Sequence, residues 1–340
     1  MKAEKIAGSL SLRSKIILIL LPLAAAVLAL AVGRFSISPV TVFQSVLNKF
    51  GAGYDISNQM ETVIWTIRMP RIILALLVGA GLSVAGCAFQ SLFANPLATP
   101  DTLGVASGAS FGAALGLLFG LNLAGVQGLA LLTGILAVAL TYIAGNMKTG
   151  SVNTVVLAGI MIGSLFQALV SLVKFTADTE SQLPSITYWL MGSLSASGYS
   201  QILLGAPLII CGLLLLFLLR WRLNILPLSD DEAKASGTNI KALRLVTVIS
   251  ATAMTASCVS MCGQVGWVGL IVPHICRMRF GSNHLSLIPA SVSIGAVFMV
   301  LVDTLARSVS AAEIPISILT AVIGAPFFIS LLKKTGGWQL

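Results

Sequence analysis

Charged residues are scarce in this sequence. Of its 340 residues only 9% are Asp, Glu, Lys or Arg, whereas soluble domains carry about 25%. Hydrophobic residues make up 57% of the chain, and the mean hydropathy is +0.99. A chain this apolar cannot cover its hydrophobic surface in water, so the composition excludes a soluble domain. The formal net charge of +9 suits anionic lipid and acidic partners and does not imply nucleic acid.

Motifs for nucleotide hydrolysis and for common catalytic sites are also missing. The sequence contains no GxxxxGK(S/T) loop, no HExxH and no GxSxG. Its only histidines, His274 and His284, are both expected to be structural. Proton or ion coupling needs carboxylates near the bilayer midplane, and the apolar runs hold few. We therefore expect no catalytic residue and no cofactor bound by this chain.

Five cysteines give neither a disulfide framework nor a metal site. All of them lie inside apolar runs or at their ends, where free thiols behave as small hydrophobes. Cys258 and Cys262 are one helical turn apart. Two thiols without a nearby histidine or carboxylate make a poor soft-metal site. We expect no bound metal.

Long apolar runs recur along the chain. They cover 16–33, 71–93, 104–120, 123–145, 154–173, 201–219, 242–262, 264–276, 285–306 and 315–332. Because backbone polar groups in lipid must be bonded within the chain, such runs form helices. The first run follows basic residues and resembles a signal peptide, but its length is near that needed to span a bilayer. We predict an all-α polytopic membrane protein, one domain over residues 1–340, with about ten transmembrane helices.

The basic residues predict the orientation. If the N-terminus is placed in the cytoplasm and the helices alternate, most lysines and arginines fall on the cytoplasmic side, as the positive-inside rule requires. Both termini are then cytoplasmic. Two less apolar segments fit this topology, residues 34–70 on the outside and residues 220–241 in the cytoplasm.

Each of these two segments predicts one short helix. Ser38 and Pro39 are typical of a helix start, and the apolar positions after them indicate a helix along the outer surface. In the cytoplasmic segment Ser229 and Glu232 form a capping-box pattern, and Gly237 is typical of a helix end. A short helix should therefore project into the cytoplasm between the sixth and seventh spans.

Glycines recur at every fourth position of the third apolar run. They are Gly104, Gly108, Gly112, Gly116 and Gly120. In lipid such a ridge lets another backbone approach closely. The ridge predicts tight helix packing within one protomer, and a dimer seam or the lining of a transport pathway are the alternatives.

One pair of opposite charges lies within the apolar runs. Asp303 and Arg307 are four residues apart near the outer end of the ninth run, with the acid first, which is the favourable order for a helical ion pair. A structural pair is the first interpretation, and proton or ion coupling is the alternative.

Several short motifs together resemble one permease family. The matching segments are RMPR at 68–71, LSVAG at 82–86, NPLA at 95–98, LGV at 103–105, YWLMGSL at 188–194, VGLIVPH at 268–274 and IGAPF at 323–327. Over about residues 60–335, this order is similar to FecCD/BtuC-like permeases of type II ABC importers, which take up iron-siderophores, haem and cobalamin. Ser317 departs from the pattern, where the family usually has glycine, and could alter packing at the start of the tenth span.

The resemblance implies a ten-helix permease of the bacterial or archaeal cell (inner) membrane that forms a homodimer, with the translocation pathway at the dimer seam. Two cytoplasmic ATPase subunits, which use ATP and Mg, and an extracytoplasmic substrate-binding protein would complete the importer. The residues implied in ATPase coupling are Asp230, Asp231, Glu232, Ala233, Ser236 and Gly237. Those implied in docking of the binding protein are Arg68, Arg71 and Arg307. The fifth and tenth spans would line the seam, with Ser151, Asn153 and Thr154 at its cytoplasmic gate.

The substrate is less defined than the transporter class. Family frequency favours an iron-siderophore, while haem, cobalamin and a molybdate-type oxyanion stay open. An ion-coupled secondary transporter and a membrane-embedded sensor or scaffold are the rival functions. Dependence of uptake on ATP would distinguish an ATP-driven importer from an ion-coupled secondary transporter. Uptake of labelled substrate into vesicles would distinguish it from a sensor or scaffold.

Overall fold

Ten long helices form the described part of the chain, and they follow the ten apolar runs. The computed structural model describes residues 10–145, 152–195, 198–310 and 312–334. The long helices are α1 (Leu12–Ala31), α4 (Met69–Leu92), α5 (Val105–Leu118), α6 (Leu123–Ala144), α7 (Val152–Thr176), α9 (Tyr199–Leu218), α11 (Ile240–Cys262), α12 (Val268–Phe280), α13 (His284–Val309) and α14 (Ile316–Lys334). The described residues contain no strand, which confirms the all-α prediction.

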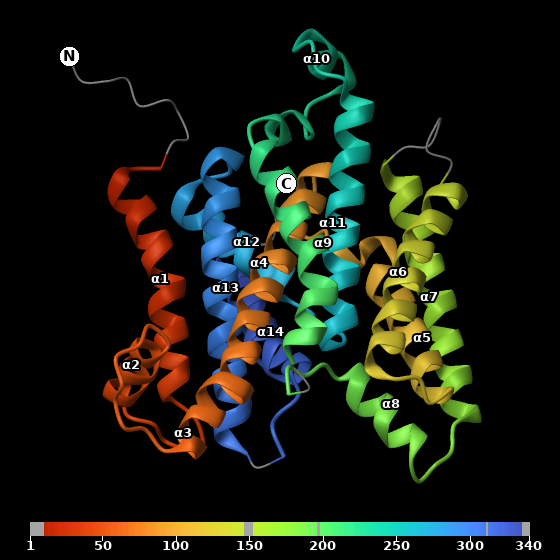
Figure 1. Ribbon diagram of the computed structural model, residues 1–340. Helices are drawn as coiled ribbons and strands as arrows, with labels where there is room; N and C mark the ends of the chain where they lie inside the picture. The colour runs from red at the N-terminus through yellow and green to blue at the C-terminus, as the bar shows by residue number, and fades with distance from the viewer. Residues whose placement is uncertain (1–9, 146–151, 196–197, 311, 335–340) are drawn as a thin grey trace, which may run out of the picture.

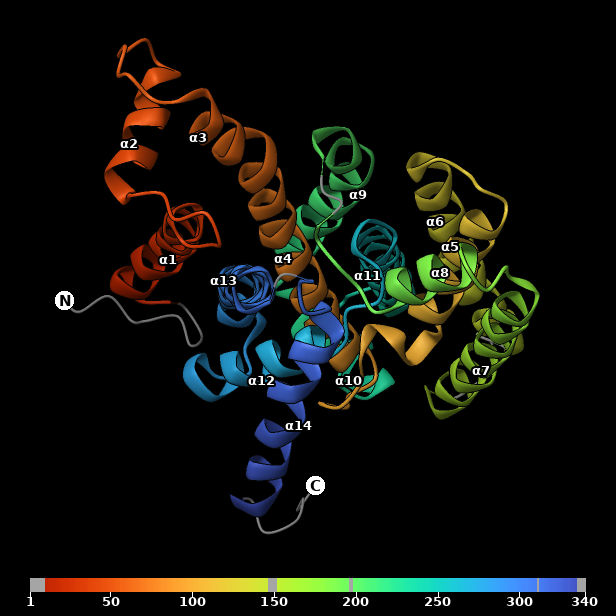
Figure 2. The same ribbon diagram turned by 90° about the horizontal axis from the view of Figure 1, so that it is seen from below.

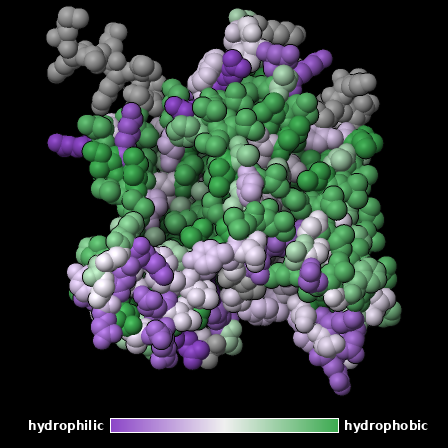
Figure 3. Space-filling view, viewed as in Figure 1, coloured by the Kyte–Doolittle hydropathy of each residue, from purple (hydrophilic) through white to green (hydrophobic). Residues whose placement is uncertain are grey.

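Seven of these helices are long and apolar enough to cross a membrane, and α5 and most of α14 are shorter apolar helices. Figure 3 shows the corresponding band of hydrophobic surface, with hydrophilic residues gathered above and below it. The protein is therefore built to be embedded in a membrane, as the composition predicted.

Short helices lie at the two ends of the bundle, except η2, which packs between α4, α7 and α11. They are α2 (Pro39–Asn48), α3 (Asn58–Thr62), η1 (Val63–Arg68), α8 (Gln182–Leu190), η2 (Pro100–Leu103), η3 (Arg222–Ile225) and α10 (Asp230–Ala235). In Figure 1, α10 projects from the top, while α2, α3 and α8 lie at the bottom. We call these ends the α10 face and the α2–α8 face. Both predicted short helices are present, as α2 and α10. Ser38 caps α2, and Pro39 is the first residue of that helix.

The helix α4 forms the centre of the bundle. Nearly all of its residues are buried, and it packs against α9, α11, α12 and α13, which surround it in Figure 2. Two glycines permit this packing: a Cβ at Gly79 would lie 2.1 Å from the carbonyl oxygen of Gly295, and one at Gly86 would lie 1.9 Å from that of Gly269. Small residues allow helix backbones to approach closely in lipid.

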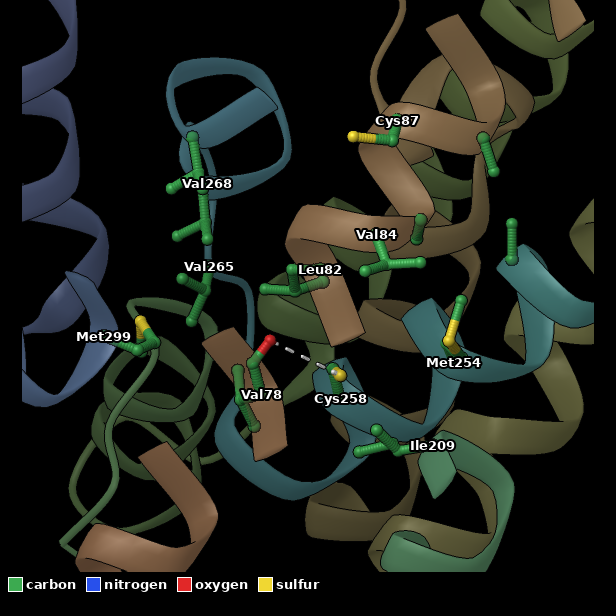
Figure 4. Packing of buried hydrophobic residues seen from close by; sticks show 14 of the residues in the cluster. Val78, Leu82, Val84, Cys87, Ile209, Met254, Cys258, Val265, Val268 and Met299 are labelled. Carbon is green, nitrogen blue, oxygen red and sulfur yellow. Dashed lines mark hydrogen bonds between the residues drawn. The ribbon is translucent and has the colours of Figure 1, made fainter. Parts of the chain in front are cut away.

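Side chains from α4, α9, α11 and the α11–α12 region interdigitate around this centre. Figure 4 shows Leu82 and Val84 of α4 among Met254, Val265 and Val268. All five side chains are at most 8% exposed. The buried cysteines belong to the same packing, as the sequence predicted for thiols in apolar runs, whereas Cys211 is exposed.

The chain between α11 and α12 is not helical, and its Gly263 and Val265 are buried. Gly263 closes α11 by donating from its N–H to the carbonyl of Val259 at 2.8 Å, and the N–H of Ser193 donates to the carbonyl of Cys262 at 2.8 Å. Trp267, which precedes α12, has a positive φ of 68°. Irregular backbone at membrane depth is tolerated only where protein or a cavity surrounds it, and these bonds provide that environment.

The glycine ridge packs within the protomer, as its first interpretation predicted. A Cβ atom at Gly108 or Gly112 would lie closer than 3 Å to Thr133 or Leu129 of α6. One at Gly116 would lie 3.0 Å from Val126 of the same helix. Gly104 precedes α5 and lies against α7 instead. Gly120 follows α5 and has no neighbour within 4 Å of a Cβ position, so it is not part of the contact.

The tightest of these contacts gives a prediction about stability. A Cβ at Gly112 would lie 2.1 Å from the Thr133 hydroxyl and 2.3 Å from the Leu129 carbonyl oxygen. We expect Gly112→Ala to destabilise the protein by about 1–3 kcal/mol through overpacking, measured as thermal unfolding in detergent. Gly128→Ala, on α6 with open space at its Cβ, is the control; equal melting temperatures for both variants would contradict the packing.

Candidate functional site

The first candidate site is the segment on the α10 face that the sequence predicted to contact an ATPase. The N–H and hydroxyl of Ser229 donate to the Glu232 carboxylate at 3.0 and 2.8 Å, and the N–H of Glu232 donates back to the Ser229 hydroxyl at 3.4 Å. These bonds confirm the predicted capping box. They lower the pKa of the Glu232 carboxyl, so it is ionised at neutral pH, and the cap is lost only as pH falls through that lowered value.

The rest of this segment is anchored through one side chain and exposed elsewhere. Ala233 is 0% exposed, while Asp231, Glu232, Ser236 and Gly237 are exposed. Gly237 ends the segment with a φ of +69°, which glycine adopts without strain. The backbone of Asp230 starts α10. The segment is therefore a short acidic helix that faces outward from the bundle.

The second candidate site was predicted from Arg68, Arg71 and Arg307 on the opposite face. All three side chains are buried, at 4%, 6% and 8% exposed. Their implied role in docking the binding protein stays a prediction, but the burial shows that these side chains lie within the protomer and do not protrude from it. Charged groups buried in this way need partners inside the protein, and the structure provides them from four separate segments.

Arg71 is the centre of this arginine network. Its Nε donates to Asp303 Oδ1 at 2.7 Å, and its Nη1 donates to both carboxylate oxygens of Glu313 at 2.9 Å. Arg307 lies 3.6 Å from the second oxygen of Asp303, so Asp303 binds Arg71 more closely than its helical neighbour. Glu313 has a φ of +53°, a conformation that side chains rarely adopt and that its bonds to Arg71 hold.

The other two arginines fix the end of α1. Arg68 donates to the backbone carbonyls of Leu30 and Phe35, and Arg307 donates to the carbonyl of Ala29. Carbonyls at a helix C-terminus have no partner within the helix, so the two guanidinium groups satisfy them. The arginine network therefore joins α1, α4, α13 and the loop before α14.

A third feature is a line of uncharged polar side chains along α7. Asn153, Ser164, Gln167 and Ser171 are exposed and recur at helical spacing on one face. Thr154 is also exposed. Ser151 lies outside the described residues. Of the predicted gate residues, Asn153 thus falls on this polar line. The sequence analysis did not find Ser164, Gln167 and Ser171, which extend the line. Their spacing of three and four residues in the sequence could have indicated a shared helix face.

The start of α14 is joined to the end of α8. The Ser317 hydroxyl donates to the carbonyl of Met191 at 2.7 Å, and the N–H of Ile316 donates to the carbonyl of Gly192 at 3.0 Å. The glycine usual in this family could not make the first bond. Ser317 thus adds a hydrogen bond at the start of the tenth span.

Several polar side chains inside the bundle are hydrogen-bonded within the protein. His284 bonds to Asn224 through Nδ1 and to Ser91 through Nε2, while the His274 ring lies 5.7 Å from that of Phe328. Gln90 donates to the Gly269 carbonyl at 3.1 Å and accepts from Arg277. Among the described residues no group of three or more His, Cys, Asp or Glu could hold a metal ion.

Comparisons with known proteins identify the family. Residues 18–334 match the FecCD transport family, and the chain belongs to that family. The molybdate import system permease protein MolB of Haemophilus influenzae is 43% identical over 93% of this chain and 94% of its own length. A probable iron chelatin transport system permease protein of Helicobacter pylori is 38% identical, over 86% of this chain and 89% of its own.

A solved structure agrees with this assignment. It is described as an inward-facing conformation of a putative metal-chelate type ABC transporter, with 40% identity and a TM-score of 0.85 over 95% of this chain and 99% of that chain. The predicted resemblance is confirmed. The protein is a membrane-embedded permease of the ABC importer class, and this family consists of transport subunits rather than enzymes.

The buried charges give the second prediction. Asp303→Asn should destabilise the protein by about 3–5 kcal/mol, because it leaves Arg71 and Arg307 buried with one carboxylate fewer; thermal unfolding in detergent measures this. Glu180→Gln, at an exposed position on the same face, should have no effect. Combining Asp303→Asn with Arg71→Met should recover part of the loss. Full stability of Asp303→Asn alone would show that the network does not stabilise the fold.

Proposed function

We propose that two copies of this chain form the transmembrane part of an ATP-driven importer, with the translocation pathway where α7 and α14 of the two copies meet. The observation that carries this proposal is the exposed polar line on α7. The Ser164 and Ser171 hydroxyls donate to carbonyls of α7 itself, and the Gln167 amide donates to the Ser107 hydroxyl. What these polar groups leave exposed is less costly to place against water or a second copy than against hydrocarbon. Small uncharged side chains can also pass a polar solute without binding it tightly.

The position of the two helices supports the same arrangement. Figure 2 shows α7 and α14 toward one side of the protomer, and only 28% of the most apolar window of α7 is buried, compared with 83% for the segment that contains α4. On α14 the side chains of Val322 and Ile329 are 64% and 53% exposed. Two unpartnered helix faces on one side suit an isologous dimer interface.

Crosslinking tests this seam. In a Cys211→Ser background, which removes the exposed thiol, Asn153→Cys should form a disulfide with its copy, and its yield should change when the ATPase is trapped with nucleotide. Leu214→Cys on α9, 57% exposed, is the matched control and should not crosslink. Failure of Asn153→Cys in every nucleotide state, or equal yields at both positions, would reject the seam.

The charge distribution supports a cytoplasmic α10 face. Arg222, Lys241, Arg277 and Arg279 all lie on or near that face, as the positive-inside rule favours. In this orientation α10 meets the ATPase, and the α2–α8 face meets the substrate-binding protein. The buried arginine network would hold the docking surface in shape rather than touch the binding protein directly.

A charge reversal tests the role of α10. Asp231→Lys should lower uptake about tenfold, equivalent to about 1.4 kcal/mol of lost coupling, while ATP hydrolysis continues. Uptake and phosphate release are measured on the same proteoliposomes. Arg13→Glu, a charge reversal at an exposed position of α1 on the same face, is the control and should leave uptake unchanged, and Ser229→Ala separates loss of the cap from loss of charge. Normal uptake by Asp231→Lys would reject the assignment.

The cargo we propose is an anionic metal species. Neither α7 nor α14 contains Asp or Glu, so the proposed pathway does not repel an anion. The relative named for molybdate import favours a molybdate-type oxyanion, and the relative named for an iron chelatin favours an iron-siderophore. Thermal stabilisation of the cognate binding protein by molybdate, ferric chelates, haem and cobalamin distinguishes them; stabilisation by cobalamin alone would contradict the anionic cargo class.

A further inference from the structure

A cavity of about 840 Å³ lies between α1, α4, α9 and α13. Its lining is mostly apolar and includes Leu18, Pro22, Leu76, Leu213, Pro289 and Ala296. Figure 3 shows the surface hollowed between α1 and the central helices. This volume is within the range of small-molecule sites, roughly 300–1,000 Å³. We call this cavity the α1 groove.

The attachment of α1 explains why the groove exists. The arginine network binds the carbonyls at one end of α1, close to the α2–α8 face. The groove follows the other half of the helix, from Leu10 to Pro22. Only 17% of the apolar window of α1 is buried. The small side chains of Ala80 and Ala296 also line the groove, so the space is not filled from inside the bundle.

Two cationic side chains mark one end of the groove. Among its lining residues the only charged ones are Lys15 and Arg220, and both lie toward the α10 face, near the ends of α1 and α9. Arg220 is held in place because its Nη1 donates to the Phe217 carbonyl at 2.6 Å and its guanidinium lies 4.2 Å above the Phe217 ring. The groove is therefore apolar along its length and positive at its mouth.

The length of the groove matches one leaflet of a bilayer. From Leu285 to Ala296 it follows α13 for roughly 16 Å at the rise of an α-helix, about half of the ~30 Å hydrocarbon core. Basic pockets between transmembrane helices are typical binding sites for anionic lipid headgroups. We propose that the α1 groove binds one anionic phospholipid, with its acyl chains along α13 and its phosphate between Lys15 and Arg220.

This site is independent of the transport cargo. It lies on the side of the protomer that carries α1 and α9, away from α7 and α14, so a second copy at the proposed seam leaves it open to lipid. A bound lipid would fill the space between α1 and α9, which the protein itself leaves hollow. The proposal therefore stands whichever substrate the importer carries.

Native mass spectrometry of the purified full chain tests the proposal. The probes are phosphatidylglycerol and phosphatidylcholine with identical acyl chains. The protein should retain phosphatidylglycerol preferentially, and Lys15→Gln with Arg220→Gln should weaken that binding about 30-fold, as expected for two interfacial charges. Binding of phosphatidylcholine should not change.

The matched control removes two neighbouring charges that do not line the groove. Arg13→Gln with Arg222→Gln should leave the preference for phosphatidylglycerol intact. Ala296→Phe, which fills the groove, should reduce retention of both lipids. Equal retention of the two lipids by the unmodified protein would overturn the proposal, since it assigns binding to the apolar surface alone. Equal losses of phosphatidylglycerol binding in the two double variants would also overturn it, since they assign binding to unspecific charge.

Discussion

Close approach of helix backbones around α4 is the constraint on which the rest of the structure depends. In lipid there is little hydrophobic drive between helices, and packing together with internal hydrogen bonds holds them. Gly79 against Gly295 and Gly86 against Gly269 bring α13 and α12 onto α4. A side chain at any of these positions would separate the helices. The interior of the protomer therefore depends on residues that contribute no side chain.

This tight centre lets the protein keep polar backbone and charge at membrane depth. The break between α11 and α12 finds its hydrogen bonds inside the bundle, and the arginine network satisfies the end of α1. The proposed transport seam and the proposed lipid site both lie at the periphery. The polar line on α7 and the exposed face of α14 are on one side, and the α1 groove is on another. A tightly packed centre with polar and hollow surfaces at its periphery suits a membrane-embedded permease of this class.

Local features of the fold were predictable from the sequence, and long-range pairings were not. The ten apolar runs predicted the positions of the ten helices, and seven of these have the length that bilayer thickness requires. The capping box at Ser229 predicted the start of α10 because both partners lie within four residues. The pairing of Arg71 with Asp303, which is 232 residues away, could not be predicted, because no local pattern connects the two positions. Helical spacing likewise predicted the face of the glycine ridge, but not that α6 packs on it.

ATP-driven movement of cargo through this permease is the central claim, and uptake into proteoliposomes tests it most directly. The permease would be reconstituted with its ATPase and binding protein, and accumulation of labelled molybdate or ferric chelate measured with ATP on the α10 side. The account predicts uptake that requires ATP and continues when ionophores collapse the proton and sodium gradients. Uptake that proceeds without ATP and stops when those gradients collapse would contradict it.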